Sequence, residues 1–140
     1  MKQILTMRIS FDADVLIYAS KAGFALGEKV AALLADPARD GERYGSVLLL
    51  PELLIKPTRL QQAQEQQNLV FCLSRLTLID ITEAVAELAV GLGARYGLKA
   101  ADALHLASAV HIGAEAFLTN NHKDFASDIA ELQVLHPEAL

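Results

Sequence analysis

Three acidic residues stand where their carboxylates could act together on a metal ion. Asp12 and Glu52 each follow closely on a short apolar run, and Asp102 lies inside the largely apolar segment 98–110. Carboxylate oxygens are the ligands that Mg²⁺ and Mn²⁺ prefer, and these ions bind through a few carboxylates together with substrate phosphates. The three acids together indicate a site for a hard cation.

The first two acids also have ordinary structural interpretations. Asp12, or its neighbour Asp14, would serve equally well as the N-cap of a following helix. Glu52 comes directly after Pro51, which is favoured at the first helical position, and an acid in the first turn complements the helix dipole. Neither position by itself distinguishes a metal ligand from a helix terminus.

Asp102 is the most unusual of the three acids. The helix predicted around it is apolar or small on nearly every side, which is typical of a buried helix. An ionised carboxylate in such a helix is costly unless it is paired, bound to a metal or open to a cleft. An ion pair with Lys99 or Arg95 is the structural alternative to a functional role.

A polar loop follows the apolar run that begins at Ala116. It carries Thr119, Asn121 and Asp124 in quick succession, although residues of these types are also common in turns. The four histidines and the single cysteine show no zinc-binding spacing, and no phosphate-binding glycine motif or serine-nucleophile motif occurs. These patterns favour oxygen ligands over the other common kinds of site.

Short apolar runs that alternate with helix-like stretches must position these side chains. The alternation predicts a mostly parallel five-stranded sheet with helices on both faces, a three-layer α/β/α fold. Because ligands bind at the carboxyl ends of parallel strands, the acids and the polar loop are expected at that edge of the sheet. The predicted strands are 8–11, 46–50, 76–80, 116–119 and 133–135.

Three helices are outlined by apolar spacing and by signals at their ends. One covers Phe24 to Leu34 before the breaker Asp36-Pro37, and another follows an N-cap at Thr82. A polar helix is predicted from Pro57 to Ser74. Its apolar side chains are expected to be buried against the core or a second subunit: Leu60, Ala63, Val70 and Phe71.

Length and composition predict one compact domain over residues 1–140. The 140 residues are 53% hydrophobic and 21% charged, which excludes intrinsic disorder. The single cysteine, Cys72, lies in an apolar stretch and is expected to be buried. Neither a leader nor a bilayer-spanning run is evident, so we expect a cytoplasmic protein without membrane association. The net charge of −5 argues against a broad basic surface for nucleic acid, but not against a nuclease that grips phosphates through metal ions.

Four segments give this chain a family resemblance. Residues 12–18, 49–54, 98–107 and 119–125 resemble, in order and spacing, the motifs of the PIN-domain family, and within it the small ribonuclease toxins of VapBC-type toxin–antitoxin pairs. The Asp-Ala-Leu-His core of the third segment is the most distinctive piece. In the first segment, Asp14 stands where an amide or hydroxyl is usual in the family.

The resemblance implies a set of site residues. The acidic metal-binding cluster would be Asp12, Glu52 and Asp102, with Thr119 and Asn121 at the rim of the pocket. Many relatives have Asp at the position of Asn121, and Asp124 would approach the cluster only if its loop folds back. The implied metal ligands are Asp12, Glu52, Asp102 and Asn121, and the implied catalytic residues are Asp12, Glu52, Asp102 and Thr119.

The resemblance also implies an activity and partners. A Mg²⁺ or Mn²⁺ ion held by Asp12 and Asp102 would lower the pKa of a bound water, and Glu52 would orient or deprotonate that water for RNA hydrolysis. The implied protein is a metal-dependent endoribonuclease, a homodimer, and the target of a cognate antitoxin that blocks its cleft.

Two other functions remain open on the sequence. A catalytically weak or inactive PIN-fold module that binds RNA or protein is suggested by the amide at Asn121. A phosphoacceptor signalling domain would also be small, acidic and α/β, but its acceptor aspartate has no counterpart at the end of the second predicted strand, where Glu52 stands.

Overall fold

A single parallel sheet forms the centre of the chain. The computed structural model describes residues 4–35, 42–126 and 128–140. Five strands lie in the order β3-β2-β1-β4-β5, and every neighbouring pair is parallel. Their bounds are β1 Ile9–Phe11, β2 Arg43–Ser46, β3 Thr77–Ile79, β4 Ala116–Leu118 and β5 Gln133–Leu135. The predicted five-stranded sheet is confirmed.

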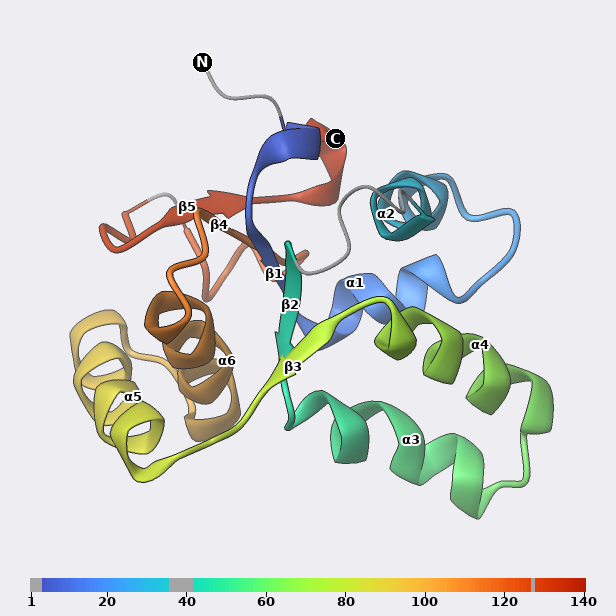
Figure 1. The fold of residues 1–140 in the computed structure, drawn as a ribbon, viewed down its shortest axis with the longest axis horizontal. Coiled ribbons are helices and arrows are strands. Elements are labelled where there is room, and N and C mark those ends of the chain that lie inside the picture. The colour runs from blue at the N-terminus through green and yellow to red at the C-terminus, as the bar shows by residue number, and fades with distance from the viewer. Residues whose placement is uncertain (1–3, 36–41, 127) are drawn as a thin grey trace.

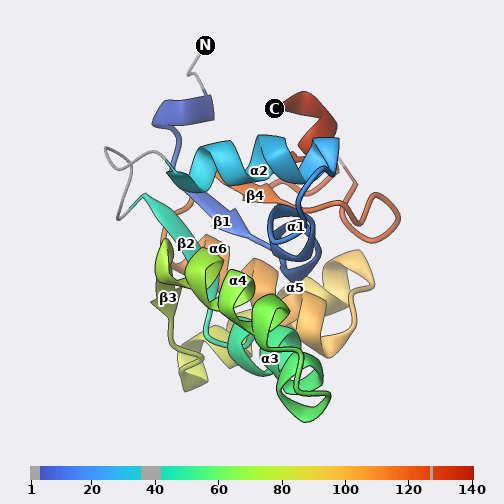
Figure 2. The same cartoon turned by 90° about the vertical axis from the view of Figure 1, so that its right-hand side faces the viewer.

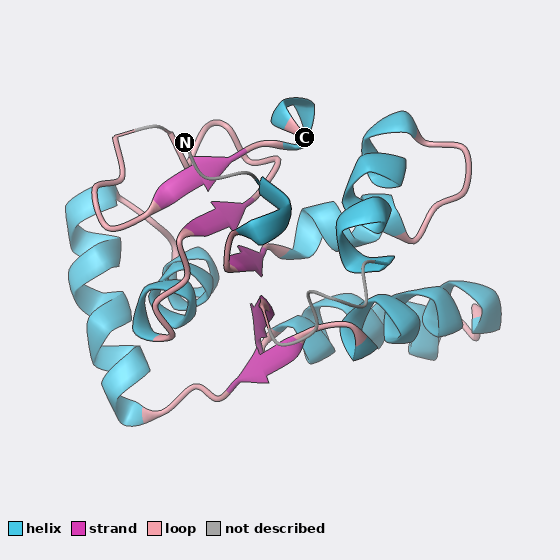
Figure 3. Cartoon of the chain, turned by 45° about the horizontal axis from the view of Figure 1, so that its top comes forward, coloured by secondary structure: helices cyan, strands magenta, loops and turns pink. Residues whose placement is uncertain are grey.

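Helices cover both faces of this sheet. Figures 1 and 3 show α5 and α6 on one side of the strands and the other four α-helices of the described chain on the opposite side. Figure 2 shows α1 between α2 and α4. The predicted three-layer α/β/α class is therefore confirmed. The helices are α1 Ala13–Ala19, α2 Ala25–Ala35, α3 Leu49–Arg59, α4 Ala63–Ser74, α5 Glu83–Tyr96 and α6 Ala100–His111, with short 3-10 turns η1 Ile4–Thr6 and η3 Pro137–Ala139.

Each face of the sheet carries its own apolar cluster. The cluster under α1 to α4 includes Phe11, Leu16 and Leu69, all almost fully buried. The cluster under α5 and α6 is built around Phe117 and Phe125. Cys72 belongs to the first cluster at 6% exposure, which confirms its predicted structural role. The two clusters pack against opposite faces of the sheet and so hold in place the edge at which the strands end.

Several helix ends follow directly from the sequence. Thr82 accepts a hydrogen bond from the backbone N–H of Val85 and so caps α5, as predicted. The same helix ends at Gly97, whose φ of +67° lies in the left-handed region that glycine adopts without strain. Helix α2 matches the predicted stretch, although Asp36 and Pro37 fall outside the described residues.

The second predicted strand was placed too late in the chain. The observed strand β2 ends at Ser46, and Leu49 already begins α3, so the predicted strand 46–50 is wrong beyond its first residue. Pro51 is the third helical residue rather than the first, while Glu52 does lie in the first turn. Leu49 is fully buried, which explains why its segment resembles a buried strand.

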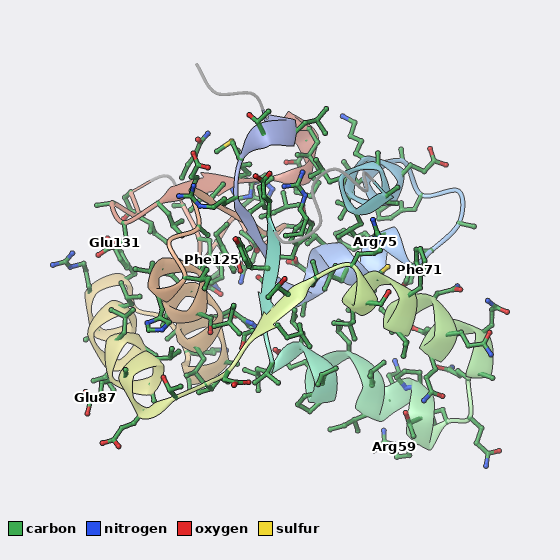
Figure 4. The ribbon with its side chains drawn as sticks, viewed as in Figure 1. Arg59, Phe71, Arg75, Glu87, Phe125 and Glu131 are labelled. Atoms are coloured by element: carbon green, nitrogen blue, oxygen red, sulfur yellow. The ribbon has the colours of Figure 1, made fainter. Side chains whose placement is uncertain are left out.

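The predicted helix from Pro57 to Ser74 is two helices. Helix α3 contains Pro57 and ends at Arg59, and α4 begins at Ala63 after a break in which Gln61 has a φ of +55°. The side chains expected against the core or a second subunit do not pack on the core, since Phe71 is 64% exposed and Leu60 50%; their burial against a second subunit stays a prediction. Figure 4 shows Phe71 on α4, whose buried side chains are Leu69, Cys72 and Leu73.

The contact between α1 and α2 depends on a glycine. A Cβ added to Gly27 would lie 2.0 Å from the carbonyl oxygen of Tyr18, so the backbones of the two helices would have to separate. Overpacking of this kind costs about 1–3 kcal/mol, or roughly 3–9 °C in Tm for a chain of this size. We expect Gly27→Ala to lower Tm in a thermal melt followed by circular dichroism.

The matched control for this prediction is Gly91→Ala in α5. A Cβ at Gly91 would meet nothing within 4 Å, so the substitution brings only the higher helix propensity of alanine, worth up to about 1 kcal/mol. Gly91→Ala should leave Tm unchanged or raise it. A Gly27→Ala protein as stable as the original chain would show that the close approach of the two helices does not constrain the fold.

Candidate active site

The carboxyl ends of the strands bring the candidate residues to one edge of the sheet. Asp12 follows β1, Thr119 follows β4, and Glu52 lies in the first turn of α3, the helix that comes after β2. Asp102 lies in the first turn of α6, which packs beneath the same strands. This is the edge at which the sequence places a ligand site.

Asp12 is the N-cap of α1, and it also lies at the edge of the sheet where the sequence predicts a metal ligand. It lies at the carboxyl end of β1, and its Oδ1 accepts the backbone N–H of Ala13 at 2.8 Å, as an N-cap of α1 does. Its Oδ2 accepts the hydroxyl of Thr119 at 2.7 Å. Burial raises the pKa of Asp12, and the charge of His105 and the bond from Thr119 offset part of that rise. A buried carboxylate with a raised pKa is typical of functional sites.

Thr119 joins β4 to Asp12. Its side chain is fully buried, and besides donating to Asp12 it accepts the backbone N–H of Asn121 at 3.0 Å. The hydroxyl has one proton, and that proton points to the carboxylate. Thr119 therefore holds the side chain of Asp12 in place and does not itself reach outward.

The loop after β4 folds back on itself. The Asn121 side-chain amide donates to Asp124 Oδ2 at 2.9 Å, and the backbone N–H of Asp124 donates to Asn121 Oδ1 at 3.1 Å. Phe125 anchors the loop between α6 and the sheet, with its ring centroid 5.0 Å from that of Phe117 (Figure 4). The fold-back carries the charge of Asp124 toward Asp102, whose pKa it raises. The charge of Asp124 therefore acts on the acidic group. Both polar atoms of the Asn121 side chain, Oδ1 and Nδ2, are hydrogen-bonded to Asp124.

Asp102 lies within reach of several like charges. Burial is the largest cause of its raised pKa, and the repulsion of Asp124 is the next. The negative charge of Glu52 raises this pKa further. His105 and, to a smaller extent, Lys99 lower this pKa only in part, and Arg95 of α5 is paired instead with Glu131, in the segment before β5, at 3.0 Å. Within the described ranges no ion pair of Asp102 is found, so the structural alternative raised by the sequence does not account for it.

His105 stands at the centre of the acidic group, and sequence reasoning missed it. The ring is 1% exposed, and its Nε2 contacts Glu52 Oε1 in a close ion pair. Burial alone would lower the pKa of His105, but the bond to Glu52 and the charges of Asp12, Glu52 and Asp102 raise it overall. The available signal was its position three residues after Asp102, because residues three apart share one face of a helix.

The donor set fits a hard divalent cation by its chemistry. Asp12 and Asp102 repel each other electrostatically, both have raised pKa values, and a cation between them would relieve that cost. The directions of the side chains are not those of a closed ligand shell. Among the described residues no group of three His, Cys, Asp or Glu side chains is placed to hold a metal ion, and one carboxylate oxygen of Glu52 contacts His105 instead. The site offers oxygen ligands at one edge, and Glu52 would have to leave His105 to join them.

Asp14 is a further acid of this edge whose charge the structure leaves poorly compensated. Burial and the nearby charge of Asp12 raise its pKa from 3.8 to about 6, although it accepts the backbone N–H of Asn120 at 3.2 Å. An asparagine would keep an acceptor for that N–H and carry no charge.

We expect Asp14→Asn to stabilise the chain at neutral pH in the presence of EDTA. Because the folded pKa lies above the unfolded one, the original chain loses stability as pH rises from about 4 to about 6. The variant should gain about 1–2 kcal/mol above that window, after discounting for partial exposure, or roughly 3–6 °C in Tm. The gain should vanish below pH 4. Melts at pH 3.5 and 7.5 measure it, and an equal Tm difference at both pH values would contradict this account.

The described part of the chain contains no helix with both the length and the apolar character that crossing a bilayer requires.

Comparison with known proteins gives a family and structural relatives. The model of a family described as PIN domain matches residues 9–131. None of the curated proteins compared matches this sequence. Among solved structures, a toxin–antitoxin complex from Klebsiella pneumoniae is similar over 92% of this chain and 97% of that one, with 29% identity and a TM-score of 0.72.

Two further structures share the fold at lower identity. The VapBC2 complex from Rickettsia felis, bound to a DNA fragment from its promoter, has 21% identity over 91% of this chain and 97% of that one, with a TM-score of 0.70. FitAcB from Neisseria gonorrhoeae has 22% identity over 94% of this chain and 99% of that one, with a TM-score of 0.64. At these identities the likeness concerns the fold.

Proposed function

Because the chain belongs to the PIN-domain family, whose members are generally nucleases that use divalent metal ions, we propose that it is a Mg²⁺- or Mn²⁺-dependent endoribonuclease. The resemblance drawn from its four motifs is thereby confirmed at the level of the family. The reaction that we propose is hydrolysis of RNA phosphodiester bonds.

One observation carries this proposal. Asp12 and Asp102, from two different elements, lie close enough at the carboxyl edge of the sheet for the charge of Asp102 to raise the pKa of Asp12. Like charges that are held together at a cost to stability are typical of sites that bind a cation or substrate. Glu52 and Asp124 add negative charge around Asp102.

Each side chain has a role in this proposal. Asp12 and Asp102 would hold the ion, with Glu52 as a further ligand and Asn121 at the rim. The bound ion would neutralise charge that develops on the scissile phosphate and make the attacking water easier to deprotonate. Glu52, once released from His105, would orient that water or accept its proton. Thr119 holds Asp12 through its hydroxyl and acts as a positioning residue.

We further propose that the protein is the toxin of a VapBC-type pair and works in the cytoplasm. Support comes from the structural relatives, which include toxin–antitoxin and VapBC complexes, the first of them at 29% identity. The partners would be an RNA substrate, a cognate antitoxin and a second copy of this chain, without membrane association. The exposed apolar side chains of α3 and α4, among them Ile55 at 60% and Phe71 at 64%, leave surface for a protein partner.

A cleavage assay tests the proposed function. Purified chain, free of any antitoxin, is incubated with end-labelled structured RNAs in Mn²⁺ or Mg²⁺, with and without EDTA. We expect fragments that carry a 5′-phosphate and a 3′-hydroxyl, formed only with the metal. Cleavage that continues in EDTA would refute the metal-dependent reaction. Absence of cleavage together with measurable RNA binding would favour the non-catalytic module suggested by Asn121 and by the open ligand geometry.

A further inference from the structure

Two histidine rings are stacked beside the candidate site. The rings of His122, in the loop after β4, and His136, after β5, have centroids 3.7 Å apart and planes inclined by 19°. The two residues come from neighbouring parallel strands, β4 and β5, whose pairing brings their carboxyl ends together. They form a flat, layered surface at the same edge of the sheet as the acids.

Hydrogen bonds fix this pair relative to the acidic group. The Nδ1 of His136 donates to the backbone carbonyl of Thr119 at 2.8 Å, and the hydroxyl of that same threonine donates to Asp12. His122 lies in the folded-back loop, directly after Asn121 and two residues before Asp124. Thr119 and His136 therefore connect Asp12 to the ring of His122, which is the outer ring of the pair, without a flexible segment between them.

The outer ring of the pair is open. The side chain of His122 is 54% exposed, although one face of its ring is covered by His136. Its Nε2, at the edge of the ring, lies 3.4 Å from Glu138 of η3, and within the described residues His136 is the one aromatic ring found stacked on it. An exposed aromatic face that is already held in position loses little freedom when a second flat group stacks on it.

We propose that His122, supported by His136, is a stacking platform for one base of the RNA substrate. The inference rests on the proposed ribonuclease function and adds a subsite to it. Single-stranded RNA is recognised largely by stacking of its bases on aromatic rings, histidine included, and stacking accepts any base. A chain with a net charge of −5 gains little from a general attraction to phosphates, so stacking contributes a larger share of its affinity.

Fluorescence of a base analogue tests the platform without cleavage. The probe is a pentaribonucleotide of uridines with 2-aminopurine at its centre, titrated with protein at pH 8 in EDTA. Stacking quenches 2-aminopurine, so we expect quenching by the original chain. His122→Ala should weaken binding about tenfold and abolish most of the quenching, within the range for one stacked base. His122→Phe, which restores a stacking ring, should restore both.

The control is His111→Ala. His111 is exposed at the far end of α6, nine residues and about 14 Å along the helix from Asp102, and should bind and quench like the original chain. Circular dichroism melts check that the His122 variants remain folded. Equal binding and quenching by the original chain and His122→Ala, or no quenching by the original chain, would overturn the platform.

Cleavage kinetics separate this inference from the proposed function. If RNA is cleaved, His122→Ala should raise KM about tenfold and leave kcat within about twofold, because a stacking contact with a base that does not react binds substrate and transition state alike. Cleavage with an unchanged KM would retain the ribonuclease and reject the platform. Quenching that depends on His122 in a protein that cleaves no RNA would retain the platform and reject the ribonuclease.

Discussion

Replacing Asp102 by asparagine is expected to reduce metal-dependent RNA cleavage by more than about a hundredfold, since loss of even a residue behind a metal ligand typically costs roughly 10- to 100-fold. The substitution removes one of the two carboxylates proposed to hold the ion and keeps the shape of the side chain. Burial and the charges of Asp124 and Glu52 raise the pKa of Asp102, so the neutral variant should be no less stable than the original chain without metal. Initial rates under single-turnover conditions and a thermal melt in EDTA measure the two effects.

Glu87→Gln is the matched control for Asp102→Asn. Glu87 is an exposed acid on the outer side of α5 (Figure 4), and its removal changes the net charge by the same amount. Its rate should equal that of the original chain within about twofold, since an exposed charge outside the site contributes little. An Asp102→Asn protein that cleaves as fast as Glu87→Gln would remove Asp102 from the mechanism.

Binding of Mn²⁺ is expected to raise Tm in the original chain and not in Asp12→Asn. A ligand at a hundred times its Kd stabilises the folded state by about 2.7 kcal/mol, which corresponds to roughly 5–11 °C for a chain of this length. Asparagine caps a helix as well as aspartate does, so α1 should keep its N-terminus in the variant. Melts in 5 mM MnCl₂ and in EDTA give the shift for each protein.

A second acid tests whether this shift is specific to the site. Asp128 is exposed in the segment before β5, and Asp128→Asn should show the same rise in Tm with Mn²⁺ as the original chain. A rise that persists in Asp12→Asn would mean that Mn²⁺ acts elsewhere on the acidic surface.

Local patterns were sufficient to predict the framework of the site. The apolar run before Asp12, the strand at 133–135 and the cap at Thr82 each depend on a few neighbouring residues, and the structure confirms all three. Parallel pairing then follows from the alternation of strands and helices, which places Asp12 and Thr119 at one edge. That residues 1–140 form one domain stays a prediction, as do the roles of the site residues.

Errors arose where tertiary packing decides between equivalent patterns. The run at 47–50 is short and apolar, and periodicity cannot distinguish a buried strand from the buried start of a helix such as Leu49 provides. The break at Gln61 lies between two polar helical stretches without a glycine or proline at the turn itself. Pro57, which looked like a helix start, is tolerated inside α3.

The contacts within the site could not be predicted, because they join distant segments. The ion pair of Glu52 with His105 links residues 53 positions apart, and neither carries a local sign of the other. The approach of Asp124 to Asp102 depends on a loop that folds back through two bonds with Asn121. Sequence motifs identified the acids, and only the fold shows that one of them is held by a histidine.

We propose that Asp12, Asp102 and Glu52 act as one metal site for RNA hydrolysis. The most direct measurement follows the initial rate of RNA cleavage across a series of Mn²⁺ concentrations, beside the Mn²⁺ binding isotherm of the same protein by titration calorimetry. We expect one class of bound ion, a half-maximal rate at its Kd, and no cleavage in EDTA. Cleavage at full rate in EDTA, or Mn²⁺ bound without any RNA cleavage, would contradict it.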